Sequence, residues 1–194
     1  MDLITPKDVS WHGVCDLRLI NRSFLPDSGK ELTIHQSKCK APFKLMRGSN
    51  NVDGRLEIPI LHTAGGLVGG DQLSVNVIAE KGTSALITTV AAQKVYGSVG
   101  VSRVHPQGSW AKQICHFDLG NEADLEWFPQ ELVLFADGLF EQNMYVDLCS
   151  DSSFLSAEVV RLGRTSAGEK LGNGCWRSRL EIRRNFQNEK QWEF

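Results

Sequence analysis

The chain has 194 residues, of which 41% are hydrophobic, and a formal net charge of -2, so it can bury a core as one domain and carries no general basic surface for nucleic acid. Its five cysteines include no Cys-x-x-Cys pair, which excludes a structural zinc motif and a disulfide framework and favours a reducing compartment. The sequence shows neither a signal-peptide pattern nor an apolar run of about 18 residues, so we expect a soluble, cytoplasmic protein without a membrane partner.

Strand patterns follow one another along the chain. Apolar and polar residues alternate over residues 14–20, 56–60, 73–77 and 176–182, and turn-forming residues separate such runs. No window of about 12 residues keeps the 3.6-residue period of a helix. We therefore predict one all-β domain over residues 1–194, mainly β with few short helices, built from stacked or wrapped, antiparallel-rich sheets. A sandwich, a barrel and a solenoid all fit this pattern.

Two segments depart from the regular succession of strands and turns. Residues 91–96 are compatible with one short helical turn, which Gly97 would end. Residues 191–194 begin another alternating strand, and no turn or polar tail follows them. We therefore expect the chain to be truncated at its C-terminal end.

The glycine-rich stretch at residues 61–73 has the most unusual composition. Four glycines within six positions lead to a single carboxylate, Asp71. Strand patterns lie on both sides of the stretch, and neither a P-loop nor a dinucleotide-binding fingerprint is present. Taken alone, the stretch indicates a tight connection between two strands. A functional role for it needs support from the rest of the chain.

Charge is unevenly distributed along the chain. Residues 121–160 hold nine Asp and Glu residues and no Lys, Arg or His, whereas residues 161–194 hold eight Lys and Arg residues against four acids. Such a gradient can attract cations or a basic partner to one part of the surface. Solvated outer faces of strands would produce the same pattern.

Metal-ligand residue types are present, but they are not spaced as a preformed site. The candidates of the borderline or soft type are His35, Cys39, His62, Cys115 and His116. No pair among them has the spacing that places two ligands on one face of a helix or strand, so we expect no tightly bound metal. A loose series of carboxylates could instead pass a divalent cation along; its members are Asp71, Glu126, Glu131 and Glu158.

Two of these acids have informative neighbours. Glu126 points away from the face that carries Leu125 and Trp127, so it is exposed if that face is the core. Glu158 lies in a nearly continuous apolar run, where an acid is usually paired or acts as a ligand. An ion pair with Arg161 or Arg164 is the structural alternative for Glu158.

Enzymatic activity finds little support, and we expect no catalytic residues. The chain has no Gly-x-Ser-x-Gly elbow, and its Ser, His and Asp residues are scattered. A two-carboxylate hydrolase would need two acids about 5 to 9.5 Å apart in an open cleft. A β-sandwich that binds a ligand or carbohydrate is another alternative, and it would present an exposed aromatic platform near Trp110 or Trp127.

Four motifs in register resemble the urease accessory protein UreD family, also called UreH. They are the strings HTAGGLVGGD at residues 62–71, ITTVAAQKVYGS at 87–98, LEWFPQE at 125–131, and RLGR at 161–164, which continues to Gly168 and Glu169. Their order and spacing match over residues 11–185, which makes the resemblance specific although each motif alone is weak.

The resemblance implies a nearly all-β fold without enzymatic activity of its own. It also implies a scaffold that binds apo-urease together with UreF and the GTPase UreG and supports nickel insertion, with nickel(II) in transit. By the same resemblance, Asp71 and Glu158 are the leading candidates for an acidic ion channel, and Glu126, Glu131 and Glu169 follow. Residues assigned on this basis to partner binding are Lys94, Tyr96, Arg164 and Glu169.

Overall fold

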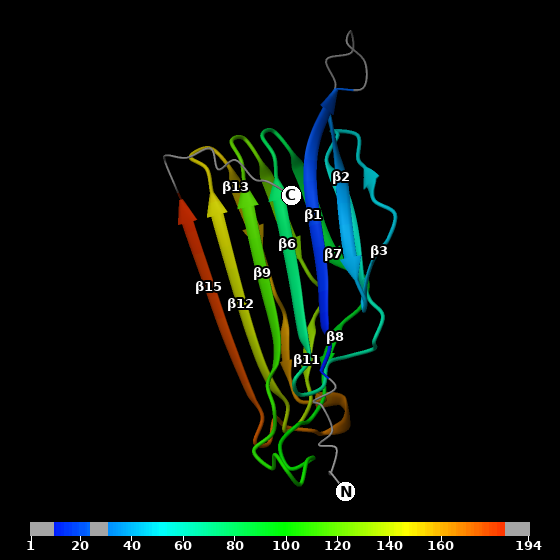
Figure 1. Ribbon diagram of the computed structural model, residues 1–194, viewed down its shortest axis with the longest axis vertical. Coiled ribbons are helices and arrows are strands. Elements are labelled where there is room, and N and C mark those ends of the chain that lie inside the picture. Colours follow the sequence, from blue (N-terminus) through cyan, green and yellow to red (C-terminus); the bar gives the residue numbers. More distant parts are fainter. Residues whose placement is uncertain (1–9, 24–30, 185–194) are drawn as a thin grey trace, which may run out of the picture.

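The computed structural model describes residues 10–23 and 31–184, which form strands and one short 3-10 helix (Figure 1). The strands are β1 (His12–Ser23), β2 (Glu31–Lys40), β3 (Phe43–Leu45), β4 (Ser49–Asn50), β5 (Leu56–His62), β6 (Gln72–Ala79), β7 (Ser84–Thr89), β8 (Gln93–Val95), β9 (Ala111–Leu119), β10 (Asp124–Phe128), β11 (Leu132–Leu134), β12 (Leu139–Leu148), β13 (Ser153–Ser156), β14 (Val160–Leu162) and β15 (Cys175–Arg184). The 3-10 helix, η1, spans Thr165–Ala167. The prediction of a mainly β chain with few short helices is confirmed.

Most of the chain winds as a solenoid with three walls. One wall has the strand order β15-β12-β9-β6-β1-β2, the second has β13-β10-β7-β5-β3 with β4 beside β5, and the third has β14-β11-β8. Strands β7, β8 and β9 therefore form one coil, β10, β11 and β12 form the next, and β13, β14 and β15 form the last. The long strands of the first wall run side by side in Figure 1.

Successive coils pair in parallel. Val75 of β6 lies opposite Cys115 of β9, which in turn lies opposite Met144 of β12. Antiparallel pairing joins only β1 to β2 and β5 to β3 and β4 within the described ranges. The prediction of antiparallel-rich sheets is therefore wrong. Alternation fixes the face that each residue takes, but it is the same in parallel and antiparallel strands.

The inward-facing side chains of the coils share one hydrophobic core. Phe117 of β9 packs against Trp127 of β10, with ring centroids 5.4 Å apart, and both side chains are almost fully buried. Ile58 and Ile87 pair in the second wall and are also buried. Burial of each such side chain contributes about 1.5 to 3 kcal/mol to the hydrophobic free energy of folding. The shared core holds the coils in place relative to one another, and it therefore also sets the positions where the loops between their strands begin and end.

The segment predicted as a short helical turn is a strand instead. Residues 93–95 form β8, in which Val95 is fully buried and pairs with Leu134 of β11. Pairing with the next coil therefore outweighs the weak helical preference of this segment. No helical segment within residues 10–23 and 31–184 has the length and apolar character that a membrane crossing requires. The strand expected at residues 191–194 lies outside the described residues.

Candidate functional site

The glycine-rich stretch forms the third wall of the first coil, between β5 and β6. Leu67 makes a parallel bridge to Val95, and its amide donates to the carbonyl of Lys94 over 2.8 Å. A side chain at Gly69 would have its Cβ 2.6 Å from the carbonyl oxygen of Ser109, and Gly70 has a φ of 96°. Only glycine fits both the close approach and the left-handed backbone. The glycines thus let a loop without regular strand geometry stack directly on β8.

Asp71 ends this loop as a buried carboxylate, only 2% exposed. Its Oδ2 accepts a hydrogen bond from the amide of Val68 over 2.9 Å, and its own amide donates to the carbonyl of Val68. Its Oδ1 is buried and has no hydrogen-bond partner. One carboxylate oxygen therefore closes the turn, and the other is left unpaired.

His62 lies at the other end of the same loop, as the last residue of β5. Its ring packs against Trp11 and Phe43, with centroid distances of 5.6 and 6.1 Å. Its Nε2 is buried without a hydrogen-bond partner. Burial lowers the pKa of His62, and the nearby charge of Asp71 partly opposes that effect. Both ends of the glycine-rich loop thus carry an unpaired buried polar atom.

Glu158 lies in the connection between β13 and β14, and part of the residue is exposed to solvent. Its carboxylate nevertheless turns toward the core and accepts a hydrogen bond from the side-chain amide of Gln142, which is buried. Burial raises the pKa of the Glu158 carboxyl, whereas Gln142 and the nearby indole N–H of Trp127 oppose the rise. That indole forms no well-aligned hydrogen bond. Glu158 is therefore an inward-facing acid with an amide partner.

Glu126 and Glu131 differ from the other two acids because each has an arginine partner. Glu126 lies 2.5 Å from the guanidinium of Arg55, and both side chains are partly buried. Glu131 lies 3.8 Å from Arg161 at the surface. The structural alternative for Glu158, an ion pair with Arg161 or Arg164, is wrong. Arg161 pairs with Glu131 instead, and Arg164 pairs with Glu169.

Three of the four residues assigned to partner binding meet around Phe135, which follows β11. The ring of Tyr96 packs edge-on against Phe135 at 5.0 Å, and the guanidinium of Arg164 lies 4.6 Å from the centroid of the same ring. Arg164 pairs with Glu169, which also accepts a 2.6 Å hydrogen bond from the amide of Ala136.

Lys94 is exposed and lies apart from the Phe135 contacts, on β8. Phe135 was missed by sequence reasoning, although its place directly after Leu134 matches that of Tyr96 after Val95. The available signal in the sequence was an aromatic residue directly after an aliphatic one, as in Val95-Tyr96 and Leu134-Phe135.

The two tryptophans proposed as a sugar platform are not free to act as one. Trp127 is 1% exposed and belongs to the core. Trp110 is covered by Arg177, whose guanidinium lies 4.1 Å from the ring centroid. Within the ranges that the structure describes, no three His, Cys, Asp or Glu side chains come together as a metal site.

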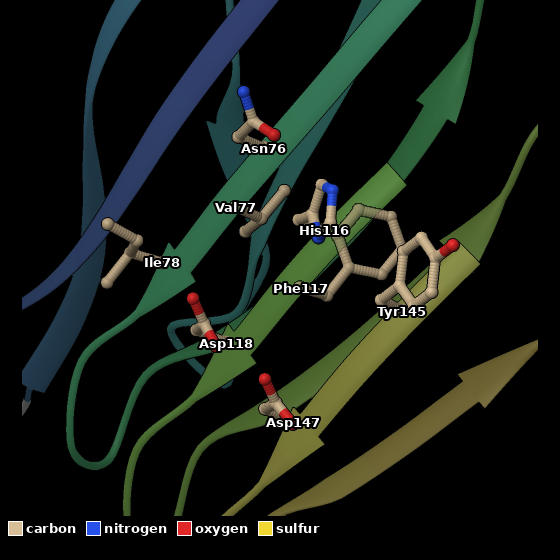
Figure 2. Close-up of a pocket in the computed structure, with 8 residues that line it drawn as sticks. All are labelled: Asn76, Val77, Ile78, His116, Phe117, Asp118, Tyr145 and Asp147. Atoms are coloured by element: carbon tan, nitrogen blue, oxygen red, sulfur yellow. The ribbon is translucent and has the colours of Figure 1, made fainter. Parts of the chain in front are cut away.

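A separate hollow of about 350 Å³ lies on the outer face of the wall formed by β6, β9 and β12 (Figure 2). The rings of His116 and Tyr145 stack there with centroids 4.9 Å apart. Asp118 and Asp147 lie side by side in register at its edge. His116 therefore faces outward while Cys115 faces the core, as the alternation predicted.

A family model described as UreD urease accessory protein matches residues 12–192. The chain belongs to the UreD family. Among similar proteins named urease accessory protein UreD, one from Prochlorococcus marinus (strain MIT 9303) is 60% identical over 186 residues, which cover 96% of this chain and 62% of that protein. One from Prochlorococcus marinus (strain MIT 9313) is 59% identical, with 96% and 58% covered, and one from Synechococcus sp. (strain CC9902) is 57% identical, with 94% and 57% covered.

This UreD-family chain spans about three fifths of the length of those relatives. Only some of its candidate residues come together. Tyr96, Phe135 and Arg164 come after the third-wall strands β8, β11 and β14, and the glycine-rich loop forms the same wall of the preceding coil. Strands β8 and β11 lie in the lower half of the solenoid in Figure 1. Glu126 and Glu131 lie with their arginines instead. Three of the four motifs, those at residues 62–71, 87–98 and 161–164, thus converge where the third wall turns into the first.

Proposed function

We propose that this chain acts in urease maturation as a non-catalytic scaffold and metallochaperone, which binds apo-urease with UreF and UreG in the cytoplasm and assists nickel insertion. Family membership supports the accessory role. The observation that carries the nickel part is Asp71, a buried carboxylate whose Oδ1 has no donor. A buried charge without a partner is costly, so such a group is usually retained for a ligand.

The chemistry of the acids suits transit better than storage. Carboxylates are hard ligands and nickel is a borderline cation, so a site made mainly of oxygen atoms holds nickel more weakly than a histidine and thiolate cage would. Asp71 and Glu158 face the interior and have no arginine partner in the contacts of the described residues. We therefore centre the transit role on these two acids, and treat Glu126 and Glu131 as members of structural ion pairs.

Co-expression with urease and its other accessory proteins tests the proposal. The change is Asp71→Asn, because the amide oxygen can still accept the hydrogen bond from Val68. We expect the variant to accumulate normally while the nickel content and activity of urease fall at least about tenfold, because a neutral amide oxygen is a weaker ligand for the ion than a carboxylate.

The matched control is Glu131→Gln, which neutralises an exposed acid and should leave the nickel content of urease unchanged. Equal nickel content in the Asp71→Asn strain and the unmodified strain would refute the transit role. Unfolding of Asp71→Asn, seen by circular dichroism, would assign the carboxylate to the turn alone.

We further propose that Tyr96, Arg164 and Glu169, together with the exposed Lys94 on β8, contact a protein partner. The support is an aromatic and charged surface fixed by the Phe135 contacts. Tyr and Arg are enriched among residues that carry binding energy. Arg164→Ala should weaken co-purification with apo-urease or UreF by about 1 to 2 kcal/mol, whereas Arg161→Ala should not. Unchanged co-purification with both partners would exclude this surface.

A further inference from the structure

We propose that His62 is a nitrogen ligand that acts with Asp71, so that the two ends of the glycine-rich loop form one two-point site for a divalent nickel ion. This inference rests on the proposed transit role of Asp71 and adds a second, chemically different ligand to it.

Two unpaired buried atoms at the ends of one loop are the main evidence. The Nε2 of His62 and the Oδ1 of Asp71 both lie buried without a hydrogen-bond partner. Buried polar atoms in folded proteins nearly always have a partner, so each exception requires an explanation. Imidazole nitrogen and carboxylate oxygen are both common ligands of nickel and similar cations. One bound ion would satisfy both atoms together.

The surrounding contacts leave these two atoms free and fix the groups that carry them. Thr63, directly after the histidine, donates from its amide and its hydroxyl to the carbonyl of Pro42, each over 2.9 Å. At the other end, the Oδ2 of Asp71 is held by the amide of Val68. Trp11 and Phe43 pack on the imidazole ring. The loop therefore orients both residues through contacts that do not use Nε2 or Oδ1.

Trp11 contacts both ends of the loop and so places the two residues close together. Its ring packs on His62 with centroids 5.6 Å apart, and its carbonyl accepts a hydrogen bond over 3.0 Å from the amide of Gln72, which directly follows Asp71. A neutral imidazole can present a lone pair to a metal ion. The remaining coordination positions of the ion would then belong to exchangeable ligands, as transit requires.

Glu158 provides an internal contrast. Its carboxylate already accepts a hydrogen bond from Gln142, so it is not an unpaired group of the same kind. A nickel ion that binds there must displace or share that amide. We therefore expect the pair formed by His62 and Asp71 to bind nickel more tightly than Glu158 does.

Calorimetric titration of the purified chain with nickel chloride tests the inference. The variants are His62→Gln and Asp71→Asn, and the matched control is His116→Gln, which removes an imidazole on the outer face of the solenoid. We expect each of the first two variants to weaken nickel binding at least tenfold and the control to leave it unchanged.

Each outcome has a distinct meaning. Nickel binding that is weakened by Asp71→Asn but not by His62→Gln would overturn the inference and leave the proposed function intact. A chain that binds no nickel, or that binds it equally well without the Asp71 carboxylate, would instead refute the ion role of Asp71.

A measurement on the unmodified chain covers the case in which His62→Gln fails to fold. Nickel is paramagnetic, so the ring-proton resonances of the residue that binds it should broaden first in nuclear magnetic resonance spectra. We expect the His62 resonances to broaden before those of His12 and His116. If they stay sharp at nickel saturation, the two atoms are satisfied by water and the inference is wrong.

Discussion

The middle coil and the last coil place similar residues in the same register but bury them to very different extents. Met144 and Val146 of β12 are 4% and 1% exposed, whereas Leu180 and Ile182, which pair with them from β15, are 58% and 51% exposed. Strand β12 has neighbours on both sides, while β15 is the edge of its wall among the described residues. An apolar residue that faces inward is therefore buried only when coils lie on both sides of it.

This contrast separates two properties of a side chain, namely the face of the strand on which it lies and the extent to which it is buried. Alternation determines the face on which a side chain lies, and Leu180 and Ile182 obey it as well as Met144 and Val146 do. Burial depends in addition on the next coil, which contributes its own side chains. The same distinction applies to polar groups, because Glu158 of the last coil obtains its amide partner from Gln142 of the middle coil. Three measurements can break or sharpen the comparison.

The largest expected difference concerns thiol reactivity. Cys115 of β9 is completely buried, and burial raises its pKa from an ordinary 9.0 to about 12. Its thiolate fraction near neutral pH is thus about a thousandfold lower than that of an ordinary thiol. Cys175 of β15 is only partly buried. We expect iodoacetamide to alkylate Cys175 at pH 8 while Cys115 stays protected, as mass spectrometry of peptides can measure. Comparable rates in the native state would mean that the inner coils open readily.

A matched pair of alanine substitutions compares the two coils directly. Met144→Ala should lower the free energy of unfolding by about 2 to 5 kcal/mol, because it leaves a cavity between filled coils. Leu180→Ala should lower it by less than about 1 kcal/mol, because much of the side chain already contacts water. Urea denaturation of the two variants measures both values. A loss at Leu180 as large as that at Met144 would show that other residues cover β15 in solution.

The smallest effect is a change in the pH dependence of stability, carried by Glu158 where the two coils meet. Burial raises the pKa of this carboxyl in the folded chain. The folded state therefore binds more protons than the unfolded state once the pH exceeds 4.5, the ordinary value, and the free energy of unfolding falls as pH rises through the raised pKa.

Glu158→Gln removes this titration while an amide remains beside Gln142. We expect the variant to gain stability relative to the unmodified chain as the pH rises above 4.5, in urea denaturation at a series of pH values. A difference in stability that is independent of pH would mean that the carboxylate is solvated equally in both states.

The sequence predicted the faces of the strands better than the pairing between them. Leu125 and Trp127 were placed opposite Glu126, and both are buried while Glu126 is not in the core. Whether β10 pairs in parallel or antiparallel with its neighbours depends on the path of the chain between strands, and alternation carries no information about that path. The prediction of antiparallel-rich sheets failed for this reason.

For the candidate site, local signals were informative and distant partners were not. The glycines and Asp71 stood out because only a special backbone needs that composition. Arg55 pairs with Glu126 but lies far from it in the sequence. Gln142, the partner of Glu158, likewise lies outside the segment around Glu158. Long-range contacts of this kind are set by stacking of the coils, which a single sequence does not encode in its short-range patterns.

The stacked path of the chain makes the length of the molecule adjustable in fixed steps. Each added or deleted coil would change that length by about 4.8 Å, the spacing between neighbouring strands, without altering the cross-section. A lineage could therefore move one end of such a body relative to the glycine-rich loop by duplicating a single coil. The distance between the glycine-rich loop and the far end of the solenoid can therefore vary in steps of one coil while the loop itself stays unchanged.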